Sequence, residues 1–429
     1  MKGYLESIIP DSFSGQIFAL EGIDRVCVLL NGPTGCKFYN SATSDSQRIR
    51  MWEFDPLCYP EELFFGQPRV PCTYLDSRDY VYGSREKLTE ALGFLRDNVD
   101  FDLLCVVNSP GAALIGDDLR GIVRAVLPET PLVIMQTPGY SKSVCGGFDA
   151  AATALFEQLS PEPSGKERHG VNFLGLSIFH RDHEGSAAEM RRLMGLCGVE
   201  VNCFLCESGG LDEIKAVPDA ALNVVLYPEY GLATAKYLKE RYGTPYYVCE
   251  GPPIGFSATE KFVKDVCALL GAEPSAALED CAKARARVYV FISRLNSLTG
   301  LPKGVRFSVE GTYSECCAYV SFLTGYFGMA AECVTVLGAE YDCCRKKLED
   351  LLASLGLSDA LTRGMEEAES ELVLASGATI AHLKLGKRRF VGIETSLPSM
   401  GYVDVIPKTH LGVAGALLLT EQVINGMIY

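Results

Sequence analysis

The sequence predicts an α/β protein built from three doubly wound, Rossmann-like domains with mainly parallel sheets. Three observations lead to this prediction. The chain has 429 residues, 48% of them hydrophobic, which is enough to build several cores. Short, continuous apolar runs alternate with amphipathic helical stretches, a rhythm typical of parallel sheets covered by helices on both faces. Segments rich in Pro, Gly, Ser and charge interrupt this rhythm at 159–170 and 270–280.

The two interruptions divide the chain into predicted domains at 1–165, 166–280 and 281–429. Strands are expected at 25–30, 102–108 and 132–137, then at 171–179, 199–205, 222–227 and 245–250, and finally at 305–309, 332–337, 371–376 and 389–394. Amphipathic helices are expected between them, for example at 231–243 and 312–328. Ligands of such sheets bind beyond the carboxyl ends of the strands, so the residues that follow each strand are candidates for a site.

Composition narrows the classes of partner and compartment. The net charge of −15 argues against nucleic acid or an anionic membrane as the main partner, and it suits a docking partner with basic residues. No apolar run reaches membrane-spanning length and the N-terminus lacks a signal-peptide core, so we expect a cytoplasmic protein. Its 17 cysteines, an odd number without regular spacing, indicate reduced thiols rather than a disulfide framework. Neither glycine-rich nucleotide-binding pattern is present, so any ATP is bound by another protein.

The first expected strand ends in the turn "NGPTGC", which places Cys36 at its tip. Three interpretations stay open at this point. Cys36 is a nucleophile whose histidine base comes from another domain, a packing residue, or a ligand of a metal or cluster. The third is favoured by Gly32 and Gly35, which let backbone N–H groups approach a thiolate. Cys72, in "RVPCTYLDSRDYVYG", is the second ligand candidate, and Ser109 occupies the tip of the loop "NSPGAALIGDD".

A second group of polar residues follows strands of the middle domain. The loop "IFHRDHEG" places His180, Arg181 and His183 directly after one strand, and Tyr227 ends another. Residues at strand ends are functional candidates in this architecture. The alternative is a solvated polar turn.

The turn with Cys36, the cysteine ahead of an acidic turn, and the "SPGAALIGDD" loop resemble three consecutive signatures of the nitrogenase component 1 family. Segments 222–266, 304–329 and 407–428 are similar to later parts of that family, including its terminal helix. The resemblance implies three domains around a central cleft and an oxidoreductase with an iron–sulfur cluster at a subunit interface. It implies an ATP-hydrolysing iron protein as electron donor, and a small-molecule substrate in the cleft beside His180, Arg181, His183 and Tyr227.

The departures from the family pattern refine the expectation. Ser109 replaces the third family cysteine. The lone cysteine that anchors the nitrogenase cofactor would fall near Tyr227, and it is absent here. We therefore do not predict an eight-iron cluster or dinitrogen reduction. Cys36 and Cys72 from each of two protomers give the four thiolates of a 4Fe-4S cluster, with Ser109 beside it. The partner protomer is an identical or a sister chain. The alternative functions are a scaffold or carrier for assembly of a metal cofactor, and an α/β enzyme without a cluster.

Overall fold

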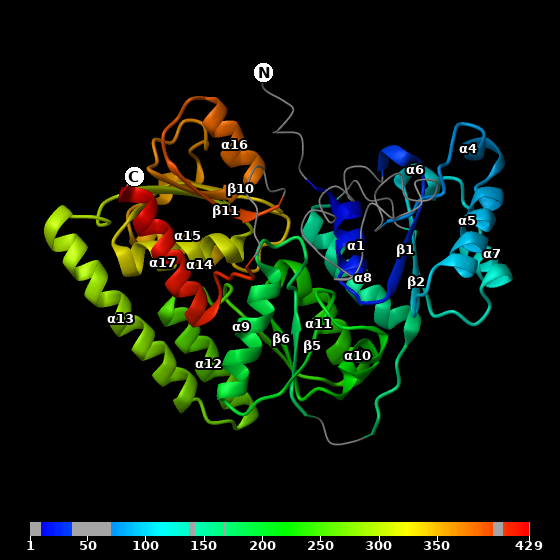
Figure 1. The fold of residues 1–429 in the computed structure, drawn as a ribbon, viewed down its shortest axis with the longest axis horizontal. Coiled ribbons are helices and arrows are strands. Elements are labelled where there is room, and N and C mark those ends of the chain that lie inside the picture. The colour runs from blue at the N-terminus through cyan, green and yellow to red at the C-terminus, as the bar shows by residue number, and fades with distance from the viewer. Residues whose placement is uncertain (1–9, 37–69, 137–141, 166–168, 398–405, 429) are drawn as a thin grey trace.

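The computed structural model describes residues 10–36, 70–136, 142–165, 169–397 and 406–428. Within these ranges the chain forms three sheets, and every pairing between their named strands is parallel. Figure 1 shows the first sheet and its helices on one side of the molecule, with the other two sheets beside it. The prediction of three α/β units with parallel sheets is thus confirmed, while the domain boundaries at 165 and 280 stay a prediction.

The first sheet has the order β1-β2-β3. Its strands are β1 (Val26–Asn31), β2 (Leu103–Asn108) and β3 (Leu132–Met135). Its helices are α1 (Ser12–Glu21), α4 (Asp79–Tyr82), α5 (Arg85–Asn98), α6 (Pro110–Ala113), α7 (Leu119–Val126) and α8 (Val144–Leu159). Side chains of a strand alternate between its faces, and both faces of this sheet are covered. In β1, Val28 packs into the main core shared with α1 and α8, whereas Leu29 packs against α5 and α7.

The second sheet has the order β5-β4-β6-β7. Its strands are β4 (Val171–Leu174), β5 (Val201–Phe204), β6 (Leu222–Val225) and β7 (Tyr246–Val248). Its helices are α9 (His183–Leu196), α10 (Leu211–Ala216), η3 (Val217–Asp219), α11 (Pro228–Tyr242) and α12 (Phe256–Leu270). Helix α11 also packs against α8, so the first and second sheets share one core.

The third sheet has the order β11-β10-β8-β9. Its strands are β8 (Arg306–Gly311), β9 (Ala330–Val336), β10 (Leu372–Ser376) and β11 (Val391–Ser396). Its helices are α14 (Tyr313–Phe327), α15 (Arg345–Ser354), η4 (Ser358–Leu361) and α16 (Gly377–Leu385). A capping box starts α14, in which Thr312 and Glu315 satisfy each other's backbone N–H groups.

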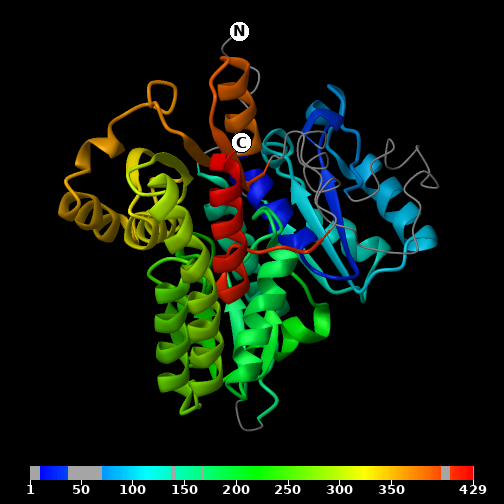
Figure 2. The same cartoon turned by 60° about the vertical axis from the view of Figure 1, so that its left-hand side comes forward.

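Two long helices connect the second and third units. Helix α13 (Ser275–Thr299) runs along the edge of the molecule, and α17 (Gly412–Ile428) packs against α9, α12 and α13 (Figure 2). The isolated bridge between His180 and Ser396 joins the loop after β4 to the end of β11. The carboxyl ends of the second and third sheets therefore face a common centre. In the described ranges no helix is both long and apolar enough to cross a membrane.

Candidate functional site

The three loops that follow β1, precede α4 and follow β2 are tied together by one buried amide. The Asn31 Nδ2 donates hydrogen bonds to Asn108 Oδ1 at 2.8 Å and to Ser84 Oγ at 3.1 Å. The Thr73 hydroxyl donates to Asn31 Oδ1 at 2.9 Å. Asn31 and Asn108 are both buried at the carboxyl ends of adjacent strands. The network therefore fixes the loops of Cys36, Cys72 and Ser109 relative to one another.

Backbone hydrogen bonds place Cys72 directly beside the end of β1. Thr73 N donates to Leu30 O at 3.0 Å, and Leu75 N donates to Gly32 O at 3.1 Å. Leu30 and Cys72 form a parallel bridge, so the Cys72 segment extends the sheet by a short edge. Gly32 N in turn donates to the Thr73 hydroxyl at 3.0 Å.

The close approach of two loops explains Gly32. A Cβ added at Gly32 would lie 2.6 Å from the Ser109 Cβ, which is too close for two carbon atoms. Ser109 N donates to Asn31 O at 2.9 Å, and the Ser109 hydroxyl accepts from Ala112 N at 3.3 Å as the cap of α6. By contrast, a Cβ at Gly35 would meet no described atom within 4 Å. Gly32 is thus required by packing, whereas Gly35 is not.

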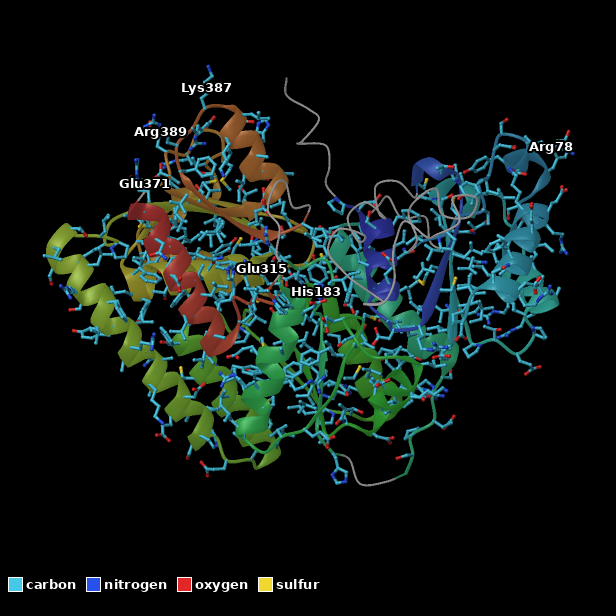
Figure 3. The ribbon with its side chains drawn as sticks, viewed as in Figure 1. Arg78, His183, Glu315, Glu371, Lys387 and Arg389 are labelled. Atoms are coloured by element: carbon cyan, nitrogen blue, oxygen red, sulfur yellow. The ribbon has the colours of Figure 1, made fainter. Side chains whose placement is uncertain are left out.

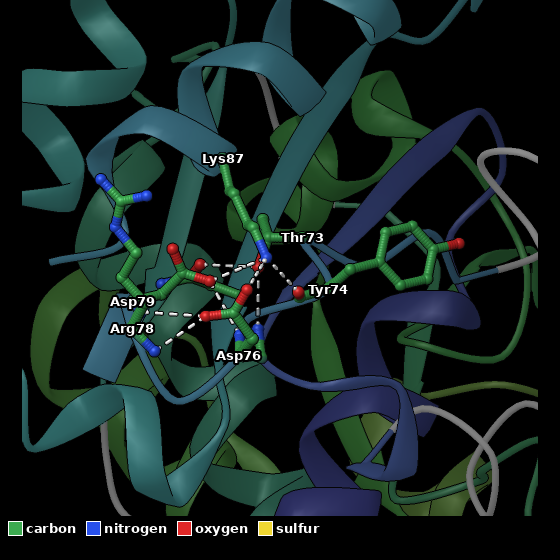
Figure 4. Close-up of polar contacts among 8 residues, drawn as sticks. Thr73, Tyr74, Asp76, Arg78, Asp79 and Lys87 are labelled. Carbon is green, nitrogen blue, oxygen red and sulfur yellow. Dashed lines mark hydrogen bonds and ion pairs between the residues drawn. The ribbon is translucent and has the colours of Figure 1, made fainter. Parts of the chain in front are cut away.

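The acidic turn after Cys72 is held by one lysine (Figure 4). Lys87 Nζ donates to Tyr74 O at 2.7 Å and pairs with Asp79 Oδ2 at 2.8 Å and Asp76 Oδ2 at 3.1 Å. Asp76 N also donates to Asp79 Oδ2 at 2.7 Å. These contacts lower the pKa of the Asp76 carboxyl, chiefly through the hydrogen bond from Lys87. The turn that follows Cys72 is therefore rigid as well as charged.

The two thiols fit one half of an iron–sulfur site. Cys72 is buried, and Cys36 is half-buried in a turn closed by the bond from Cys36 N to Pro33 O at 3.2 Å. Thiolates are the usual ligands of iron–sulfur clusters. Among the described residues, no group of three or more His, Cys, Asp or Glu side chains could hold a metal. Cys36 and Cys72 thus have the chemistry of cluster ligands, and their role as such stays a prediction.

A cavity of about 350 Å³ lies between the three units. Ser143 and Cys145 line it from the first unit, His180 and Tyr230 from the second, and the third unit contributes the remaining polar walls. Three carboxylates and two imidazoles belong to its lining: Glu310, Glu315, Glu366, His180 and His382. No lysine or arginine is among its described lining residues. This central cavity lies between the three units, where the family resemblance implies a cleft.

The His180 ring is fixed in the wall of the central cavity. It stacks on Tyr227 with ring centroids 4.0 Å apart and meets Tyr230 edge-on at 4.6 Å. Ser177 N donates to His180 Nδ1 at 3.0 Å. Burial lowers the pKa of His180 to about 3. At neutral pH the imidazole is therefore uncharged and carries its only proton on Nε2.

A second, much smaller cavity of about 10 Å³ adjoins the loop after β4. Arg181, Asp182 and Tyr227 line it, together with His410 and Thr395. The Arg181 guanidinium forms a buried ion pair with Glu394. His410 accepts from the Tyr319 hydroxyl at Nδ1 and donates to Gln422 from Nε2, both at 2.8 Å. The small cavity is therefore strongly polar.

The structure brings together three of the four residues expected at the cleft. His180 lines both cavities, and Arg181 and Tyr227 line the small one. His183 lines neither cavity in the described part of the chain, because it starts α9 and is buried with its Nδ1 2.8 Å from Glu207 Oε1. In the view of Figure 3, His183 and Glu315 both project near the centre of the molecule. The functional roles of all four stay predictions.

Sequence reasoning did not single out three residues of the central cavity, namely Cys145, Glu310 and Glu315. Glu310 and Glu315 flank the end of β8, so the rule that sites follow strand ends could have found them. Cys145 lies in the first turn of α8, which packs on the first sheet, and its thiol lies 2.9 Å from the Ser143 hydroxyl. Burial raises the pKa of this thiol to about 12, so it is protonated at neutral pH.

Comparisons with known proteins agree with this architecture. The family model "Nitrogenase component 1 type Oxidoreductase" matches residues 12–427. One of the subunits of light-independent protochlorophyllide reductase from Synechococcus sp. (strain WH7803) is 28% identical over 267 residues, covering 59% of this chain and 50% of that protein. Its counterpart from Methylobacterium sp. (strain 4-46) is 26% identical over 376 residues, covering 85% and 72%. This chain thus spans about half the length of the Synechococcus relative.

The solved structures add evidence on the fold. Nitrogenase Cp1 at pH 6.5 superposes with a TM-score of 0.78 over 98% of this chain and 92% of that chain, at 16% sequence identity. Nitrogenase Cp1 at pH 5 gives a TM-score of 0.70 over 98% and 89%, at 18% identity. At this level of identity the likeness concerns the fold, and the family follows from the model that matches almost the whole chain. The chain belongs to the nitrogenase component 1 type oxidoreductase family.

Proposed function

We propose that the chain is the catalytic component of a nitrogenase-like reductase. In this proposal it accepts low-potential electrons at Cys36 and Cys72 and reduces a small molecule in the central cavity. The observation that carries the proposal is the Asn31 network, which holds the Cys36 and Cys72 loops together at the strand ends of one sheet. Buried polar networks of this kind cost free energy unless every member is satisfied, so they are kept where geometry matters.

Cys36 and Cys72 would hold one edge of a 4Fe-4S cluster, and a second protomer would supply the other ligands. When bound, such a cluster supplies low-potential, one-electron transfer. The rigid turn at Pro33 and the Lys87-locked turn after Cys72 keep the two thiols in place without a partner. Ser109 would lie beside the site, since its Cβ packs against Gly32. The second protomer is an identical chain or a sister chain that brings up to three ligands.

An ATP-hydrolysing iron protein is the proposed electron donor, and an exposed apolar patch supports its docking here. Val81, Tyr82 and Leu114 are 74%, 82% and 85% exposed. Val81 and Tyr82 lie in α4 and Leu114 ends α6, and these two short helices are neighbours because the Tyr80 ring lies against Gly111. Exposed aromatic and aliphatic side chains next to a redox site are typical of an interface. The chain has no phosphate-binding glycine loop of its own, so ATP chemistry belongs to the partner, in the cytoplasm.

The lining of the central cavity bears on the substrate. Glu310 and Glu366 lie in its wall together with Glu315, and no described lining residue is a lysine or an arginine. A negative cavity favours a neutral or cationic organic molecule and disfavours an anionic metal cofactor. This supports a reductase over a carrier of such a cofactor. Protochlorophyllide, named in the relatives, is one organic molecule to assay as a substrate.

The test is the iron content and electron paramagnetic resonance of anaerobically purified variants. Cys36→Ala and Cys72→Ala should lose the cluster signal and most of the iron, whereas Ser109→Ala should keep both. Cys105→Ala is the matched control, because Cys105 is a buried thiol of β2 on the same sheet, four positions before Ser109. Full iron in the Cys36 and Cys72 variants contradicts the proposal. A monomer with full iron content in sedimentation would contradict the shared cluster.

A further inference from the structure

Two residues separate the central cavity from the small polar one. Of the described residues, Glu315 and His180 alone line both. The small cavity has about 10 Å³ of space, which is close to the minimum that one water molecule requires. Its walls include Asp182, His410 and Thr395, so a water there would find polar partners. The junction is therefore the point at which water and a cavity ligand could exchange a proton.

We propose that Glu315 delivers protons to the substrate in the central cavity and is recharged through the small polar cavity. This inference deepens the proposed function, on which it rests, because it names the proton donor of the reduction. Glu315 would touch both the substrate and the water, whereas His180 would shape the junction.

The contacts of Glu315 leave one carboxylate oxygen available. Thr312 N donates to Glu315 Oε2 at 2.8 Å, and the Thr312 hydroxyl donates to the same atom at 2.9 Å. Oε1 accepts no hydrogen bond from a described residue, and Glu315 is half-buried although it lies deep within the molecule (Figure 3). Oε2 thus anchors the side chain by capping α14, while Oε1 is available for proton exchange.

His180 is unsuited to the same task. Its Nδ1 is occupied by Ser177 N, and Nε2 has no hydrogen-bond partner among the described residues. Because burial keeps the pKa of His180 at about 3, the ring does not take up a second proton near neutral pH. A fixed neutral imidazole can donate a hydrogen bond but cannot cycle through its charged form.

Unlike His180, Glu315 has surroundings that bring its pKa close to neutral pH. Burial raises the pKa of Glu315 to about 7, and the negative charge of Glu229 adds to the rise. A carboxyl with this pKa is present in both protonation states at neutral pH, as an efficient proton donor requires.

Other charged groups face the junction from neighbouring elements. Glu229 comes from α11 and Glu310 from β8, Arg181 and Asp182 come from the loop after β4, and His410 precedes α17. Arg181 is paired with Glu394, and the Glu229 carboxylate accepts from Ser314 N and Oγ. Burial also raises the pKa of the phenols of Tyr227, Tyr230 and Tyr319, which stay neutral. Burial also raises the pKa of the Glu229 carboxyl, but Glu229 lines neither cavity; among the described residues, Glu315 is the carboxyl with a raised pKa that lines both.

The proposed step balances in electrons and protons. Reduction of one double bond consumes two electrons and two protons, and the electrons come from the one-electron donor of the proposed function. The O–H bond of protonated Glu315 breaks, and a new C–H or N–H bond forms on the substrate. The resulting carboxylate then takes a proton that comes from solvent and is relayed by the water in the small cavity, which regains the proton it passes on. A second cycle supplies the second proton.

The first experiment is an infrared pH titration of the full chain without substrate. Wild type should show a protonated carboxyl band that disappears with a midpoint near pH 7, and Glu315→Gln should lack it. Any bands of Asp149 and Glu229, whose pKa values burial also raises, should be the same in both proteins. Glutamine can replace glutamate at this position of a capping box, so we expect α14 to begin at the same residue in the variant. Glu366→Gln is the matched control, since Glu366 lines only the central cavity, and it should keep the band. A wild type without such a band, or a band that survives in Glu315→Gln, overturns the inference.

The second experiment follows deuterium exchange into that carboxyl band after mixing with D₂O. Thr395→Val removes one polar wall group of the small cavity, and Thr335→Val makes the same change in the central cavity. Loss of one buried hydrogen-bond partner should slow exchange about tenfold in Thr395→Val. Exchange in Thr335→Val should match wild type. Equal rates in both variants would exclude the route through the small cavity.

Neither experiment needs a cluster, an iron protein or a substrate. If the protein holds no iron but still shows the Glu315 band, the proposed function is refuted and the assignment of Glu315 as a proton carrier stands. A protein that holds the cluster through Cys36 and Cys72 but lacks the Glu315 band refutes this inference alone.

Discussion

The two candidate regions of this molecule are built in opposite ways. The strand-end corner, formed by Asn31–Cys36, Cys72–Thr73 and Asn108–Ser109, belongs to one sheet and is held by its backbone and one amide. The central cavity is enclosed by all three units, and its lining residues range from Pro10 to Leu397. Figure 3 places Arg78, in the turn after Cys72, at one edge of the molecule and Glu315 near its centre.

The difference shows how one fold separates two tasks. A rigid corner on a single sheet can hold ligands at fixed positions near the surface, where a partner can reach them. A cavity between units excludes bulk water and shifts the pKa of its side chains, as for His180 and Glu315. Four changes would break or sharpen this contrast, and they are ordered by expected effect.

The largest effect is expected at the buried ion pair beside the cavities. In Arg181→Ala the Glu394 carboxylate loses its guanidinium in an environment where their side chains are 8% and 1% exposed. We expect the free energy of unfolding to fall by about 3–5 kcal/mol, because removing one partner of a buried ion pair leaves the other charge less well compensated. Urea denaturation measures this change. The double variant Arg181→Met/Glu394→Gln should recover part of the loss, and a double variant as unstable as the single one would contradict the explanation.

The next effect concerns the amide of the strand-end corner. Asn31→Ala removes the partner of Asn108 Oδ1 and of the Thr73 hydroxyl, both in buried surroundings. We expect a loss of about 2–3 kcal/mol in the free energy of unfolding, together with reduced iron binding. Asn98→Ala, at the exposed end of α5, is the control and should change stability by less than about 0.5 kcal/mol. Similar losses in both variants would argue against a special role for the network.

A smaller effect is expected from the close packing of two loops. Gly32→Ala forces a Cβ against Ser109, so it should destabilise the protein by about 1–3 kcal/mol. Gly35→Ala meets no described neighbour and should be close to neutral. Adding Ser109→Gly to Gly32→Ala should restore stability, because it removes the obstructing side chain. Additive effects in this double-mutant cycle would show that the two positions do not interact.

The last prediction concerns how the free energy of unfolding depends on pH through His180, where the change per pH unit is small. Its pKa in the folded protein, about 3, lies below the ordinary 6.5, so the unfolded chain binds this proton first as the pH falls. The contribution of His180 to stability is complete above pH 6.5 and declines toward pH 3, at no more than about 1.4 kcal/mol per pH unit. His180→Phe keeps a ring beside Tyr227 and should flatten the decline. Unfolding measured at several pH values checks the slope, and an unchanged slope would rule this origin out.

The sequence could predict the strand-end corner because its signals are local. A strand that ends in Asn31-Gly32 and a cysteine at the tip of the turn are visible in six consecutive residues. The position of Cys72 follows from family resemblance and from its own turn. What the sequence could not give was the burial of Cys72 or the amide that connects the loops, since Asn31, Thr73 and Asn108 are joined only by strand pairing.

The sequence by itself determined the fold class, since strand and helix periods are written in neighbouring residues and depend little on the rest of the chain. It also determined the helix expected at 312–328, which the structure shows as α14. Only the tertiary structure decided that Glu315 and His180 line the same two cavities, and that His183 contacts Glu207 instead. These contacts depend on how the three sheets pack together. Packing is set by the shapes of surfaces whose residues are far apart in the sequence, and no local pattern specifies it.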